Sequence, residues 1–210
     1  MSELSDVKDT GRQVLASRRV HRGRVMDLVA DEVLLAPDDG APVVREYLDH
    51  PGAVAVVALR GEPGREEVLL LNQYRHPARV VLWEIPAGLL DVDGEDPLPA
   101  ARRELGEEAD LRAATWDVLV DFFTSPGGSD ESVRVYLARD VSDVEDHERH
   151  ERTDEERDME LVWVPLDEAV AAVHAGRIHN PATVVGILAT ASARAQDWAP
   201  LRGVDAAWLR

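Results

Sequence analysis

The sequence predicts a mixed α/β (α+β) fold with a small antiparallel β-sheet region at its N-terminus. Short apolar runs with strand-like alternation fill most of the chain from residue 14 to residue 138. One acidic helical segment interrupts them after residue 96, and two segments with helical apolar stripes, 167–175 and 182–194, follow near the C-terminus. At 210 residues and 45% hydrophobic content, the chain can form one full domain or one domain plus a small appendage. We expect an N-terminal β region over 1–48 and a main domain over 49–210.

The N-terminal region reads as three antiparallel strands. Apolar residues alternate between Val14 and Val44, and turn-forming residues stand at 21–23 and 37–40. A sheet of this size is marginal when it stands alone. We therefore expect it to pack on the main domain or on a second subunit.

The main domain begins with strands and connecting loops. The segment 73–79 is expected to be a break that carries Arg75 and Arg79, the Gly- and Ser-rich segment 124–131 a loop, and 143–160, with ten acidic residues and no apolar period, a solvated loop. The expected strands are 54–59, 67–72, 82–88 with a tight turn at its end, 116–123, 133–138 and 161–164.

The acidic helix carries the most specific pattern. Asp96 can serve as its N-cap and Pro97 as its first residue, where a missing N–H costs nothing. Residues three and four apart share a helix face, so Glu104, Glu107 and Glu108 can converge on one point. Carboxylate oxygens suit Mg²⁺, which also binds substrate phosphates. The pattern favours a metal site; the alternative is an ordinary charged, solvated helix.

Composition excludes several classes of function. The net charge of −18 argues against a nucleic-acid surface or an anionic membrane as partner. There is no apolar run of eighteen residues, the acidic N-terminus does not look like a signal peptide, and the absence of cysteine excludes disulfides. These features fit a cytoplasmic protein, and a small-molecule nucleotide is still possible as substrate, because metal ions and local arginines can override the global field.

The stretch from Gly88 to Leu111 resembles the Nudix box, G-x5-E-x7-R-E-U-x-E-E-x-G-U, where U is a bulky apolar residue. Two positions depart from the pattern: Gly88 is followed by six residues before Glu95 rather than five, and Asp110 stands where a glycine belongs. Asp tolerates the left-handed backbone conformation better than most residues do. The matching residues are Glu95, Arg103, Glu104, Leu105, Glu107, Glu108 and Leu111.

This resemblance implies an α/β/α sandwich with a mixed sheet, and hydrolysis of a nucleoside diphosphate linked to another group. It implies two or three Mg²⁺ ions per site, with Mn²⁺ as the alternative metal. Arg103 would orient the glutamates by salt bridges rather than touch the substrate. The implied metal ligands are the Ala87 carbonyl, Glu104, Glu107 and Glu108.

Within this family the chain is similar to bacterial ADP-ribose pyrophosphatases over most of residues 14–190. Pro126 lies fifteen residues beyond Leu111, which is the marker of that subgroup, and WEIPAGLLD and SPGGSDE match it as well. The resemblance implies cleavage of ADP-ribose to AMP and ribose 5-phosphate by a homodimer that exchanges its N-terminal strands. The general base would be Glu156, which fits the E-E-x-D-M pattern, with Glu155 as runner-up; one solvated charge among many is the alternative.

Candidate substrate-binding residues come from three places: the third expected strand, the surroundings of the metal loop, and the Gly-rich loop. For Arg75 the alternative is solvation at the surface, and for the loop it is a plain hairpin connection. The full set is Arg45, Glu46, Arg75, Glu84, Pro126, Gly127, Ser129, Asp130 and Glu131.

Three other functions remain open at this point. The nearest is the same chemistry on another nucleoside diphosphate sugar. A different class is a Nudix-like module that senses nucleotides without hydrolysing them, although such modules usually lose box carboxylates, and this chain keeps them all. The third is a purely structural acidic protein, for which the box spacing would be coincidence.

Overall fold

The computed structural model describes residues 4–36, 40–145, 147, 149–150 and 159–210. The chain divides into two compact units. The first unit comprises Met1–Gly52, Phe123–Ser132 and Ala207–Arg210, and the second comprises Ala53–Phe122 and Val133–Ala206. Among the described residues, none of the helices has both the length and the apolar composition that crossing a bilayer requires.

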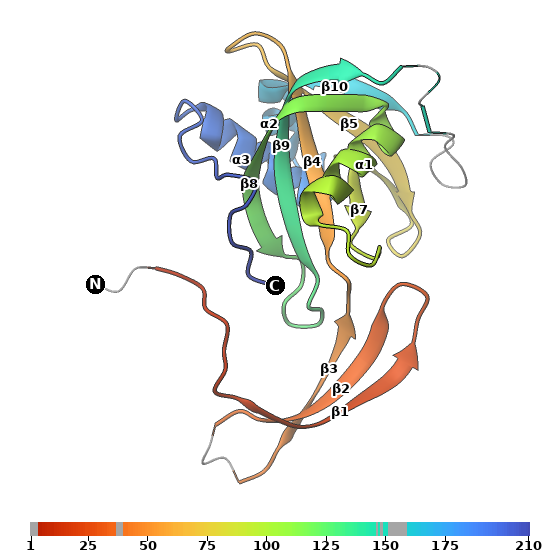
Figure 1. The fold of residues 1–210 in the computed structure, drawn as a ribbon, viewed down its shortest axis with the longest axis vertical. Helices are drawn as coiled ribbons and strands as arrows, with labels where there is room; N and C mark the ends of the chain where they lie inside the picture. The colour runs from red at the N-terminus through yellow and green to blue at the C-terminus, as the bar shows by residue number, and fades with distance from the viewer. Residues whose placement is uncertain (1–3, 37–39, 146, 148, 151–158) are drawn as a thin grey trace. The chain divides into compact units, whose positions relative to one another are not determined.

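The first unit is built on a three-stranded antiparallel sheet, as the sequence predicts (Figure 1). Its strands are β1 (Gln13–Arg22), β2 (Asp27–Leu34) and β3 (Val43–Asp49), in the order β1-β2-β3. Every residue of β1 is exposed, while β2 carries the buried residues Val29 and Ala30. The sheet therefore has one long edge strand with apolar side chains that nothing in the described chain covers.

The second unit contains a mixed seven-stranded sheet with the order β10-β5-β4-β9-β8. Strand β6 pairs with β5, and β7 pairs with β4. The pairing of β4 with β9 is parallel, whereas β4 is antiparallel to β5 and β7. The strands are β4 (Ala53–Arg60), β5 (Glu67–Arg75), β6 (Val80–Glu84), β7 (Ala87–Leu89), β8 (Leu111–Phe123), β9 (Ser132–Asp143) and β10 (Leu161–Pro165).

Helices cover both faces of this sheet, which confirms the predicted sandwich (Figure 1). The helices are α1 (Pro97–Ala109), α2 (Leu166–His174) and α3 (Pro181–Arg194). Strand β4 shows why two layers are needed, since seven of its eight residues are buried. Val54 and Val56 pack with α1, whereas Ala55 and Val57 pack in the cluster that includes α2 and α3. Because successive side chains of a strand point to opposite faces, β4 contributes side chains to both hydrophobic core layers.

Several expected boundaries were wrong in extent. Strand β5 continues through Arg75, where a break was expected, because Gln73–Arg75 pair with Val80–Leu82 of β6. Strand β8 begins at Leu111, directly after α1, rather than at Trp116. Helix α1 begins at Pro97 as predicted, but the Asp96 side chain makes no capping hydrogen bond.

Candidate active site

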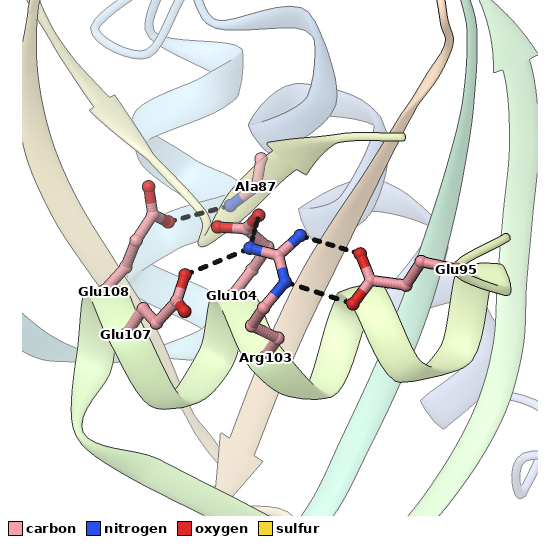
Figure 2. A network of polar contacts seen from close by, with 6 residues as sticks. All are labelled: Ala87, Glu95, Arg103, Glu104, Glu107 and Glu108. Carbon is pink, nitrogen blue, oxygen red and sulfur yellow. Dashed lines mark hydrogen bonds and ion pairs between the residues drawn. The ribbon is translucent and has the colours of Figure 1, made fainter. Parts of the chain in front are cut away.

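The site is organised by α1, which presents one guanidinium and three carboxylates toward the turn before β7 (Figure 2). The helix can hold this register because its residues Ala100, Ala101 and Leu105 are fully buried against the sheet. Its end is set by Asp110, whose φ of 55° and ψ of 35° place it in the left-handed region. The Asp110 N–H donates to the Gly106 carbonyl, so an aspartate closes the helix where the box pattern has glycine.

Arg103 connects the acidic side chains of the site (Figure 2). Its Nε and Nη2 donate to the two oxygens of Glu95 at 3.1 and 2.9 Å, and its Nη1 donates to Glu104 at 2.7 Å and Glu107 at 3.0 Å. The hydrogen bonds to Glu95, followed by the charge of Glu104, raise the pKa of Arg103 above its ordinary value. The Arg103 hydrogen bonds in turn lower the pKa of Glu95. Arg103 therefore holds Glu95, Glu104 and Glu107 in one hydrogen-bonded network.

Glu108 is held by the turn instead. One of its carboxylate oxygens accepts the Ala87 N–H at 2.9 Å, and the residue is 6% exposed. Within the described part of the chain, no three acidic or histidine side chains form a ready-made metal group. In this structure Glu104 and Glu107 are hydrogen-bonded to Arg103, whereas Glu108 is hydrogen-bonded to the Ala87 amide.

The turn from Ile85 to Gly88 is fixed by three elements. The Ile85 N–H donates to the hydroxyl of Thr183 in α3 at 3.1 Å, and the Pro86 carbonyl accepts the Val56 N–H of β4 at 2.8 Å. A Cβ atom at Gly88 would lie 1.9 Å from a carboxylate oxygen of Glu104. Only glycine lets the backbone approach the carboxylate this closely.

Two further predicted residues, Arg75 and Glu84, bind each other. Arg75 donates to both oxygens of Glu84 at 2.8 and 2.7 Å. The Glu84 side chain is 2% exposed, whereas that of Arg75 is 41% exposed. The buried Glu84 carboxylate therefore holds the Arg75 guanidinium in a bidentate pair.

A cavity of about 370 Å³ in the first unit gathers most of the other predicted residues. The loop of the β8–β9 connection forms one wall and is bonded to β3: Leu48 donates to the Gly128 carbonyl at 2.9 Å, and Asp130 accepts the His50 N–H at 2.8 Å. Of the predicted set, the cavity is lined by Arg45, Glu46, Pro126, Gly127, Ser129 and Asp130.

Glu131 does not line this cavity, because its carboxylate accepts the Thr124 hydroxyl at 2.7 Å. The sequence analysis missed two aromatic walls of the cavity, Tyr47 and Phe123. Burial, reinforced by the charge of Asp31, raises the pKa of Tyr47. Tyr47 directly follows the predicted residues Arg45 and Glu46 on β3, and this position in the sequence is the signal that could have identified it. The expected bases Glu155 and Glu156 lie outside the described residues.

Comparison with known proteins agrees with this geometry. Residues 49–183 match the family model of the NUDIX domain. The ADP-ribose pyrophosphatase of Mycobacterium tuberculosis is 43% identical over 197 residues, which cover 94% of this chain and 91% of that protein. The chain belongs to the Nudix family. A Bacillus subtilis relative, also named ADP-ribose pyrophosphatase, is 35% identical over 86% of this chain and 93% of its own length.

A solved structure supports the Nudix fold independently. The crystal structure titled as an ADP compounds hydrolase aligns with a TM-score of 0.72 over 92% of this chain and 100% of that chain, at 18% sequence identity. At this identity the match establishes the fold alone.

The residues of this Nudix site fit a divalent cation. Nudix ADP-ribose pyrophosphatases generally use divalent metal ions. The donors available here are carboxylate oxygens and one loop carbonyl, which is the ligand type that hard cations prefer. Gly88 lets the loop backbone lie close to the Glu104 carboxylate, so that oxygen donors of both are near one another.

Proposed function

We propose that the chain hydrolyses the diphosphate of ADP-ribose to AMP and ribose 5-phosphate in a Mg²⁺-dependent reaction. The observation that carries the proposal is the box itself: Arg103 binds Glu95, Glu104 and Glu107, and Glu108 is tied to the Ala87 amide. The choice of substrate is supported by the 43% identity to a relative named ADP-ribose pyrophosphatase.

In this proposal the Ala87 carbonyl, Glu104, Glu107 and Glu108 hold two or three Mg²⁺ ions, with Mn²⁺ as the alternative metal. Bound ions supply charge compensation on the phosphoryl oxygens and a lower pKa for water. Arg103 holds Glu95, Glu104 and Glu107 in one network, so that the ligand set does not have to reorganise for each turnover.

Glu156, with Glu155 as runner-up, is the proposed general base. It accepts a proton from the water that attacks one phosphorus atom. A new P–O bond forms there, and the bond between that phosphorus and the bridging oxygen breaks, so the bridging oxygen leaves with the other phosphate.

The remaining residues bind the nucleotide. Arg75 presents an oriented guanidinium to phosphate oxygens, since Glu84 accepts hydrogen bonds from its Nε and Nη2 and so fixes the plane of the group. The first unit's cavity of about 370 Å³ has the size of a small-ligand pocket. Its charged and aromatic walls, Arg45, Glu46, Tyr47 and Phe123, suit a ring with hydroxyl or phosphate substituents.

The proposal includes a homodimer that works in the cytoplasm without a nucleic-acid or membrane partner. The sheet of the first unit supports the dimer, because all ten residues of β1 are exposed. An uncovered edge strand of this length invites pairing or coverage by another chain.

Product analysis of the purified protein tests the reaction. ADP-ribose with Mg²⁺ should yield equal amounts of AMP and ribose 5-phosphate, and much faster than ADP-glucose, GDP-mannose, NADH or diadenosine polyphosphates react. Faster cleavage of another nucleoside diphosphate sugar would keep the chemistry and change the substrate. Tight binding of ADP-ribose without turnover of any compound would replace the enzyme by a nucleotide-sensing module.

A further inference from the structure

Three polar groups of the backbone turn that leads to the Ala87 carbonyl are hydrogen-bonded to other elements of the fold. Pro86 has no N–H to satisfy. The Pro86 carbonyl is bonded to β4, and the Ala87 N–H to Glu108 of α1. The Ile85 N–H donates to Thr183, which lies 98 residues further along the chain. The box helix thus fixes only one of three bonds, and α3 fixes another.

Thr183 is itself held in one orientation. Its hydroxyl donates to the side-chain oxygen of Asn180 at 3.1 Å, and its backbone N–H donates to the same oxygen at 3.0 Å. A hydroxyl has a single proton, so donation to Asn180 leaves a lone pair for the Ile85 N–H. Thr183 is 0% exposed, so water does not compete for these bonds.

Side-chain packing fixes the same point. A Cβ atom at Gly186, one turn further along α3, would lie 2.9 Å from Val57 and 3.2 Å from the Ile85 side chain. Ile85 is itself 1% exposed. Helix α3 therefore contacts Ile85 at both its amide and its side chain, two residues before Ala87.

We propose that Thr183, oriented by Asn180, is a positioning residue of the metal site: through the Ile85 amide it sets where the Ala87 carbonyl lies. The inference rests on the proposed function, since it takes this carbonyl to be a metal ligand. It extends the site from the box helix to the N-terminal turn of α3.

A matched pair of threonines in α3 allows a sharp test. Thr183→Val removes the acceptor of the Ile85 N–H at nearly constant volume, and it keeps the helix cap because Asn180 still accepts the backbone N–H of residue 183. Thr190→Val is the control: Thr190 is also 0% exposed, but its hydroxyl donates to the Gly186 carbonyl within α3. Both variants lose one buried hydroxyl, and only one of them loses a bond to the turn.

Two measurements on the full-length protein do not depend on turnover. Mn²⁺ titration followed by electron paramagnetic resonance should show about tenfold weaker binding for Thr183→Val, as for other groups that orient metal ligands. Hydrogen exchange of the peptide over residues 85–89 should be faster in the same variant without metal. Thr183→Ser should restore both readouts, and Thr190→Val should match the wild type in both.

Kinetics separates positioning from general destabilisation. For Thr183→Val the metal concentration that gives half-maximal rate should rise about tenfold, whereas kcat at saturating metal stays within about threefold of the wild type. Wild-type Mn²⁺ affinity and exchange in Thr183→Val would overturn the proposal. If valine prevents folding, Thr183→Ala measured against Thr183→Ser decides the same question. Failure of the wild type to bind Mn²⁺ would contradict the metal site, while the exchange comparison would still report whether Thr183 holds the turn.

Discussion

Glu108 joins the box helix to the turn that precedes β7, and its charge and its hydrogen bond can be separated. In Glu108→Gln the amide oxygen still accepts the Ala87 N–H, but the negative charge is gone. We expect kcat with ADP-ribose and Mg²⁺ to fall at least about 100-fold, because a metal ligand is lost. The thermal midpoint should stay close to that of the wild type. Glu168→Gln, on the exposed side of α2, is the control, and equal turnover by the two variants would contradict the metal assignment.

Asp110 lies in the left-handed region without being a glycine, so its backbone conformation is a stability feature that can be measured. Alanine lacks the local polar group that makes this region tolerable for aspartate, so Asp110→Ala should lower the free energy of unfolding by about 1 kcal/mol. Glycine adopts the conformation freely, so Asp110→Gly should be at least as stable as Asp110→Ala. Urea unfolding of the three proteins checks this order, and a more stable alanine variant would contradict it.

At the scale of elements, Glu66 connects the β4–β5 turn to α3. Burial alone would raise the pKa of Glu66, but hydrogen bonds from the Gly64 and Glu66 N–H groups and from Arg194 outweigh it and lower the pKa below the ordinary 4.5. A carboxyl with a lowered pKa in the folded state contributes stability above its unfolded pKa, and this contribution is lost as the pH falls through the folded value.

Glu66→Gln should therefore cost about 1–3 kcal/mol of unfolding free energy at pH 7, and the gap to the wild type should narrow below about pH 4. Glu67→Gln is the matched control, since Glu67 pairs with Arg60 at 2.8 Å but keeps a side chain that is 33% exposed. It should cost about 0–1 kcal/mol. Denaturant unfolding at several pH values measures both, and a gap for Glu66→Gln that is unchanged at pH 3 would contradict the assignment.

The sequence predicted helices and strands correctly where the apolar residues recur with a clear period. It missed strand residues whose conformation depends on pairing with a neighbouring strand. The box helix was placed correctly, because Pro97 and the buried stripe through Leu105 define it. Residues 73–75 lack apolar alternation and become strand because β6 pairs with them, and residues 112–115 extend β8, which neighbours β9 in the sheet. For the site, box spacing gave the glutamates and Arg103. The bond from Ile85 to Thr183 joins residues 98 apart, which no local pattern encodes.

At the scale of the molecule, the apolar surface of the first unit is the feature that needs a partner. Val14, Leu15 and Val44 are 53%, 46% and 58% exposed. The pairing register places Val14 and Val44 on opposite faces of the sheet, because Val14 pairs with Val33 and Val44 with Glu32. A small sheet with apolar residues on both faces is stabilised when another chain covers at least one of them.

Light scattering after size exclusion should therefore give twice the chain mass of 23.2 kDa. Glutamate at the covered face would be buried without a partner, so Val14→Glu or Val44→Glu should shift the protein toward monomer, and the effective variant identifies that face. Val81→Glu is the control, because Val81 is 63% exposed and lies on β6 of the other unit. The Val81→Glu variant should therefore stay dimeric. A wild type that elutes at 23.2 kDa at micromolar concentration would contradict the dimer. If the dimer completes the nucleotide site, the monomeric variant should also lose affinity for ADP-ribose while binding Mn²⁺ as the wild type does.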